Sequence, residues 1–132
     1  MTKRNLVFGI LLISLISFGY STYAFQFDDP CQRTILTVLA PKIQEEINKY
    51  YKNKLTVSPT FAPYLGGNRV EFKTFTSHID VNVTLIPYVG PHLDVGKDMI
   101  KFQIDNNGNV EVINYNHIED YKLLPNWQHI IK

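Results

Sequence analysis

The sequence is poor in cysteine and lacks the short motifs that carry most enzyme chemistry. Cys31 is the only cysteine among 132 residues, so no disulfide forms within the chain and a hydrophobic core has to stabilise the fold. The glycines form neither a dinucleotide-binding fingerprint nor a P-loop, and no serine lies in a nucleophile elbow. The chain also has no His-x-x-x-His or Cys-x-x-Cys pair. These absences predict no cofactor, no metal site and no assigned catalytic residue.

The chain also lacks a cluster of charge of one sign. Its 13 basic residues are nearly balanced by 12 acidic ones, and the basic residues are scattered without a run. A nucleic-acid-binding protein needs a concentrated basic surface, so this class is excluded. What the chain does contain is 45% hydrophobic and 13% aromatic residues. This composition predicts a compact folded domain and excludes a disordered polymer.

The N-terminal segment has the features of an export signal. A short basic start is followed by the apolar stretch 6–18 and by the small-x-small ending Thr22-Tyr23-Ala24. This order predicts a signal peptide over residues 1–24 and a single exported domain over residues 25–132. The alternative is an uncleaved membrane anchor over residues 6–25, because twenty residues without a charge are long enough to span a bilayer. Both interpretations place the folded part in a secreted or extracytoplasmic location, with membrane contact only through an uncleaved leader.

A helix is expected directly after the leader. Asp29 precedes Pro30 as an N-cap precedes the first helical position, and apolar residues then recur at spacings of three and four. Pro41 lies inside this pattern and removes one backbone donor, which predicts either a kinked helix or a helix pair with a joint near Ala40. The apolar stripe comprises Ile35, Leu36, Leu39, Ile43, Ile47, Tyr50 and Tyr51.

After residue 55 the apolar residues alternate with polar ones, as in half-buried strands. The alternation covers residues 70–74, 79–85 and 100–104, and the turn residues 106–109 precede a further apolar pair at Val110 and Val112. The last two strands are therefore expected to pair antiparallel. A helix followed by strands, without alternation of the two, predicts an α+β fold with a four- to five-stranded antiparallel sheet. An apolar tail, with Trp127 at its centre, is expected to pack over the sheet.

The segment between the two central strands is the candidate recognition element. It combines residues that shape rigid turns with side chains that can ligate or transfer protons. The candidate recognition residues are Gly90, Pro91, His92, Asp94, Gly96 and Asp98 in this segment, together with the distant His117. A rival interpretation uses His92, Asp94 and His117 in a metal-assisted hydrolase, which predicts that these side chains converge. Cys31, in the first turn of the expected helix, is a candidate reactive thiol.

Part of this pattern resembles an uncharacterised family. The similarity covers about residues 29–118 and is carried by Leu39-Ala40-Pro41, Tyr50-Tyr51, Gly90-Pro91-His92, Gly96, Asp98, Gly108 and Tyr115-Asn116-His117. The family comprises short exported proteins of spore-forming Gram-positive bacteria that share a domain of unknown function. The resemblance implies an export signal and a common fold, but no activity, cofactor or catalytic residue. Leu93-Asp94-Val95 departs from the polar or Pro-rich turn of other members.

Taken together, the sequence predicts a small exported binding or interaction module that acts at or outside the cell surface. Its partner is an unknown protein or small ligand outside the cell. Two alternatives stay open, namely the metal-assisted hydrolase and a structural component of an envelope or spore layer, in which Cys31 would link neighbouring molecules.

Overall fold

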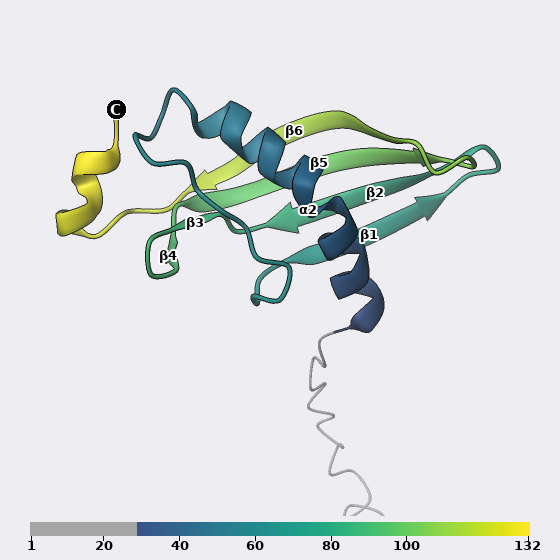
Figure 1. Cartoon of the computed structure of the whole chain (residues 1–132), viewed down its shortest axis with the longest axis horizontal. Helices are drawn as coiled ribbons and strands as arrows, with labels where there is room; N and C mark the ends of the chain where they lie inside the picture. Colours follow the sequence, from purple (N-terminus) through teal and green to yellow (C-terminus); the bar gives the residue numbers. More distant parts are fainter. Residues whose placement is uncertain (1–28) are drawn as a thin grey trace, which may run out of the picture.

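One long helix packs across one face of an antiparallel sheet (Figure 1). The computed structural model describes residues 29–132, so the predicted signal peptide lies outside the described residues. The described elements are α2 (Pro30–Tyr51), β1 (Arg69–Thr74), β2 (His78–Leu85), β3 (Tyr88–Val89), β4 (Leu93–Asp94), β5 (Gly96–Asp105), β6 (Val110–Asp120) and the 3-10 helix η2 (Pro125–Ile130). The predicted α+β class is confirmed.

Helix α2 begins as its sequence predicts. The side chain of Asp29 accepts a hydrogen bond of 3.0 Å from the backbone N–H of Cys31, and Pro30 occupies the first turn. The helix then continues through Pro41 to Tyr51 without a break, so it is one helix and not a pair. Its axis changes direction about halfway along (Figure 1), as expected where proline removes a backbone hydrogen bond.

The hydrophobic core lies between α2 and the sheet. The helix contributes its apolar stripe, of which Leu36, Leu39, Ile43, Ile47 and Tyr51 are buried. The sheet contributes alternate residues of its central strands, namely Val81, Val83, Leu85, Ile100 and Phe102. The helical and the alternating spacing in the sequence therefore marked the two surfaces that meet in this core.

The sheet has four strands in the order β1-β2-β5-β6, and every neighbouring pair is antiparallel. β5 and β6 are joined by the predicted tight turn, where Gly108 has a φ of 85° and the side chain of Asp105 accepts from the backbone of Asn107 and Asn109. Between β2 and β5 the chain forms a separate small hairpin, β3–β4. The described part of the chain contains no helix with the length and apolarity needed to cross a membrane.

The C-terminal tail closes one end of the fold. Leu123 and Ile130 are buried in the core, and Ile131 forms an antiparallel bridge with Leu55 in the loop that follows α2. The backbone N–H of Thr56 donates to the carbonyl of Ile130 over 2.7 Å. The tail is therefore buried at Leu123 and Ile130 and tied to the loop after α2, while Leu124 and Ile131 are exposed.

Candidate functional site

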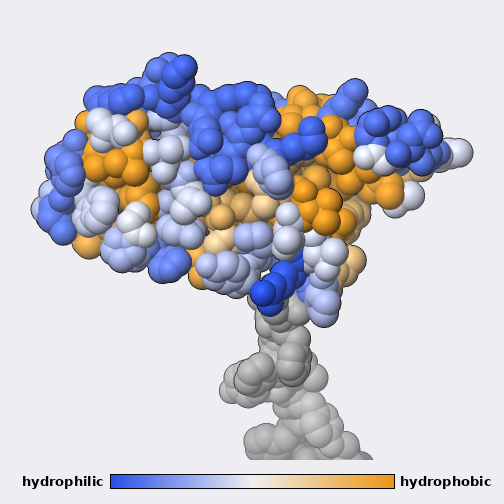
Figure 2. Space-filling model, viewed as in Figure 1, coloured by the Kyte–Doolittle hydropathy of each residue, from blue (hydrophilic) through white to orange (hydrophobic). Residues whose placement is uncertain are grey.

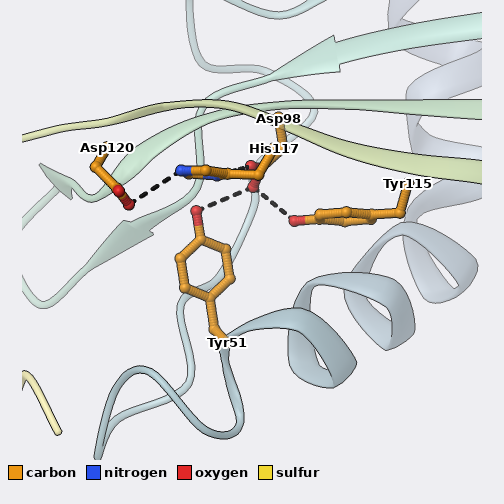
Figure 3. A network of polar contacts seen from close by, with 5 residues as sticks. All are labelled: Tyr51, Asp98, Tyr115, His117 and Asp120. Carbon is orange, nitrogen blue, oxygen red and sulfur yellow. Dashed lines mark hydrogen bonds and ion pairs between the residues drawn. The ribbon is translucent and has the colours of Figure 1, made fainter.

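A buried carboxylate lies where α2 meets the first residues of β5. Asp98 has the same strand parity as Ile100 and Phe102, so its side chain points into the core and has 0% exposure. It accepts hydrogen bonds at Oδ2 from the hydroxyls of Tyr51 over 3.1 Å and Tyr115 over 2.6 Å. Figure 3 shows these groups converging on Asp98 from the helix and from the sheet.

The imidazole of His117 completes the set of donors around Asp98. Its Nδ1 lies 2.6 Å from Asp98 Oδ1, and because a carboxylate only accepts hydrogen bonds, Nδ1 is the donor. A buried charge is tolerated when it is paired and hydrogen-bonded, and Asp98 has three donors on its two oxygens. The network therefore ties α2, β5 and β6 together at one point. We call Tyr51, Asp98, Tyr115, His117 and Asp120 the Asp98 network.

The first of two bulges in β6 aims Tyr115 and His117 at Asp98. The register between β5 and β6 shifts once between Lys101 and Phe102 and again between Lys97 and Asp98. The first shift leaves one extra residue, Ile113, on β6, and alternation then resumes with the opposite parity. Val112 and Tyr115 consequently both turn toward the helix side, although an odd number of positions separates them. Simple alternation from Val110 would have turned Tyr115 and His117 to the open face.

The network is enclosed by an aromatic ring and by a glycine. The ring of Tyr50 stacks on those of Tyr115 and His117, with centroids 5.1 Å and 4.9 Å away. Gly96 leaves the space that the network occupies, since a Cβ there would lie 2.9 Å from both His117 Cε1 and the Tyr51 hydroxyl. Any side chain at position 96 would therefore displace a member of the network.

The second nitrogen of His117 faces a carboxylate at the surface. Nε2 lies 3.0 Å from Asp120 Oδ1, which is an ion-pair distance, but the angle is unsuitable for a hydrogen bond. Within residues 29–132, Nε2 therefore has no hydrogen-bond partner although the atom itself is buried. The His117 side chain is 15% exposed and that of Asp120 81% exposed. His117 thus connects the buried carboxylate with one at the surface.

The two tyrosine hydroxyls are held in their neutral form. The pKa of Tyr51 is raised, first because burial disfavours the phenolate and then because the charge of Asp98 lies close by. The pKa of Tyr115 is raised by burial and by its hydrogen bond to Asp98. Both hydroxyls therefore remain hydrogen-bond donors at neutral pH.

A cavity of about 430 Å³ opens beside the Asp98 network. Tyr51 and Asp120 belong to both, so the network forms one side of the cavity wall. The remaining wall comes from the loop after α2, from the residue before β5 and from the C-terminal tail. The lining residues are Tyr51, Asn53, Lys54, Leu55, Val95, Asp120, Tyr121, Leu123, Ile131 and Lys132. A volume of this size falls in the range of small-molecule sites.

The structure divides the predicted recognition residues into two groups. Asp98 and His117 belong to the Asp98 network, and Gly96 lies against it. Val95, between them and the hairpin, lines the cavity. The second half of the predicted segment therefore belongs to the candidate site.

The first half of that segment forms the β3–β4 hairpin. Gly90, Pro91 and His92 make its turn, where Gly90 has a φ of 50° and His92 one of 59°. A Cβ at Gly90 would overlap the ring of Trp127, so glycine is required there by both space and conformation. The ring of His92 lies against that of Tyr88, with centroids 4.6 Å apart. These contacts describe a packed structural turn.

The residues of the hydrolase interpretation have separate surroundings. His117 is bound between Asp98 and Asp120, His92 lies against Tyr88, and Asp94 is an exposed residue of β4. Across residues 29–132, no group of three or more His, Cys, Asp and Glu side chains is placed to hold a metal ion.

The exposed thiol candidate lies away from the network. Cys31 is exposed in the first turn of α2, as the sequence predicts. The opposite end of the same helix carries Tyr51 and the Asp98 network.

Sequence reasoning missed three residues of the site. Tyr51 was expected in the apolar stripe and in the family pattern, Tyr115 only in the family pattern, and Asp120 was not singled out. The sequence contained one signal for Tyr51. Asp98 has the same strand parity as Ile100, so its side chain points toward the apolar stripe of the helix, which ends with Tyr51. The position of Asp120 depends on the second bulge of β6, which no sequence pattern predicts.

These features define a small α+β domain with a buried polar network beside a cavity. The family described as "Protein of unknown function (DUF3888)" matches residues 31–119, and the chain belongs to it. The match covers α2 and all six strands up to the residue before Asp120. No curated protein and no solved structure matches the chain.

Proposed function

We propose that this protein is a small binding module that acts outside the cytoplasm, with the cavity beside the Asp98 network as its ligand site. The observation that carries the proposal is the cavity of about 430 Å³, whose wall includes the side chains of Tyr51 and Asp120. Tyr51 is fixed by its hydrogen bond to Asp98, so this part of the wall is already formed before a ligand binds. A preformed site costs less conformational entropy on binding.

The geometry favours binding over catalysis. An Asp–His pair acts as a general base when the second imidazole nitrogen can reach a substrate proton. In this protein Nε2 of His117 is buried against Asp120, and both oxygens of Asp98 already accept hydrogen bonds. The network is therefore suited to hold the cavity wall in place.

The proposed location rests on the N-terminal sequence. The apolar residues 6–18 and the ending Thr22-Tyr23-Ala24 support export. The released form would begin at Phe25, and the anchored form would keep residues 6–25 in the membrane. In either form the domain meets a small ligand or a protein outside the cell. The spore-forming Gram-positive origin implied by the family resemblance is part of this proposal.

Export is tested by expressing the full chain in a Gram-positive host and fractionating the cells. Mass spectrometry of the N-terminus then distinguishes a product that starts at Phe25 in the medium from an intact chain in the membrane. Either result supports the proposed location, whereas an intact chain confined to the cytoplasm contradicts it.

Binding is tested on the exported protein with three six-carbon probes, hexanol, hexylammonium and hexanoate. We expect saturable binding of at least one probe, measured as a concentration-dependent rise in the melting temperature. Ile131→Trp fills the cavity and should abolish this rise. Leu124→Trp is the matched control, because Leu124 is similarly exposed in the same tail but does not line the cavity. Absence of binding by all three probes, or binding that survives Ile131→Trp, contradicts the proposal.

A further inference from the structure

The two ammonium groups at the cavity are engaged outside it. Nζ of Lys54 lies 4.8 Å from the centroid of the Tyr50 ring, and Nζ of Lys132 donates to the backbone carbonyl of Lys52. Neither Tyr50 nor Lys52 lines the cavity. The lysines therefore contribute mainly their alkyl stems to the wall, since such side chains commonly pack their stems while the charge points elsewhere.

The cavity wall contains one side-chain carboxylate, that of Asp120. Oδ1 of Asp120 faces His117, and among residues 29–132 no polar partner contacts Oδ2. The pKa of the neighbouring Tyr121 is raised, first by burial and then by the charges of Glu119 and Asp94. Further negative charge therefore lies close to this side of the cavity. The charge that a ligand would meet here is negative.

Apart from Asn53, the rest of the wall is aromatic and aliphatic. Tyr51 and Tyr121 present phenol rings, and Leu55, Val95 and Leu123 present aliphatic groups. Figure 2 shows hydrophobic residues at the surface toward the C-terminus, next to hydrophilic ones. Aromatic faces attract cations, and an apolar wall favours a ligand with an apolar body.

We propose that the ligand of this cavity is a small organic cation, with an ammonium group paired to Asp120 and an apolar body against the rings and aliphatic side chains. This proposal rests on the proposed function, because it names the ligand class of the same site. The ammonium would occupy the free Oδ2 while Oδ1 keeps its contact with His117. An anion of the same shape would be repelled by Asp120, and the ammonium groups of Lys54 and Lys132 are engaged elsewhere and do not offset this repulsion.

The experiment compares the affinities of the three six-carbon probes for the exported protein by isothermal titration calorimetry. We expect hexylammonium to bind more tightly than hexanol, and hexanol more tightly than hexanoate. Because Asp120 is largely exposed, its contribution is screened, and Asp120→Asn should weaken hexylammonium binding about fivefold. Hexanol carries no charge, so the same substitution should change its affinity much less than that of hexylammonium. Raising the salt concentration should reduce the difference between hexylammonium and hexanol.

Glu111→Gln is the matched control, because it removes the same charge from the same strand at a position away from the cavity. Hexylammonium binding should survive this change. A preference for hexanoate, or an unchanged affinity in Asp120→Asn, overturns the inference about the ligand while the binding function stands. If no probe binds at all, the proposed function itself fails.

Discussion

Removing the tyrosine hydroxyls from the Asp98 network tests whether the network stabilises the fold. Tyr115→Phe deletes a hydrogen bond of 2.6 Å to a fully buried carboxylate. A hydrogen bond to a charged group contributes about 1.5–3 kcal/mol to the free energy of unfolding. In a domain of this size a loss of about 2 kcal/mol corresponds to about 10 °C in melting temperature. Tyr51→Phe, which deletes a longer bond of 3.1 Å, should cost no more than Tyr115→Phe.

The double variant gives the sharper test. Both hydroxyls donate to the same atom, Oδ2 of Asp98, so each single variant leaves that oxygen one donor. The double variant leaves it buried with none, and an unsatisfied buried charge is costly. Tyr51→Phe and Tyr115→Phe together should therefore lower the free energy of unfolding by more than the sum of their separate effects.

The assay is urea denaturation followed by circular dichroism, which gives the free energy of unfolding for each variant. Tyr64→Phe is the control, because Tyr64 is an exposed aromatic residue, and its change should stay within about 0.5 kcal/mol. A loss below about 0.5 kcal/mol in Tyr115→Phe, or additive effects in the double variant, would refute a stabilising role for the network.

Two further predictions follow from the same site. Gly96→Ala places a Cβ 2.6 Å from the carbonyl oxygen of Glu119 and should cost about 1–3 kcal/mol on urea denaturation, whereas Gly66→Ala, with nothing within 4 Å, should be close to neutral. The raised pKa values of Tyr51 and Tyr115 mean that the unfolded chain releases these protons first. Their contribution to stability is therefore fully present below about pH 10, the unfolded value, and decreases as the pH rises above it. Absorbance at 295 nm should show these two phenols ionising only with alkaline unfolding; their ionisation near pH 10 in the folded protein would contradict the assignment.

Much of the fold was predictable because it follows from local spacing. The stripe of α2 and the alternation in β2 and β5 each reflect one face packed against a core, and Asn106 to Asn109 have the conformational preferences of a tight turn. Pro41 left two outcomes open. The apolar stripe is buried on both sides of Pro41, which stabilises one continuous helix. Such tertiary packing cannot be read from the local sequence.

The site was only partly predictable because it depends on contacts between distant segments. Asp98 and His117 were both singled out, but as parts of a loop and a region beyond a strand. The structure places them on paired strands, opposite each other in the register. The cavity needs Leu55 and Ile131, which are far apart in the sequence, to meet in the fold. No spacing pattern encodes a contact of that kind.

The first bulge of β6 absorbs one residue of this strand. Deleting Ile113 would remove the bulge, and regular alternation from Val112 would then keep Tyr115 and His117 on the helix side. Deleting Asn116 has a different effect, because Tyr115 and His117 would become neighbours in the strand and would point to opposite faces. Only one of them could then reach Asp98. Related chains are therefore expected to gain or lose a residue at the bulge more readily than between Tyr115 and His117.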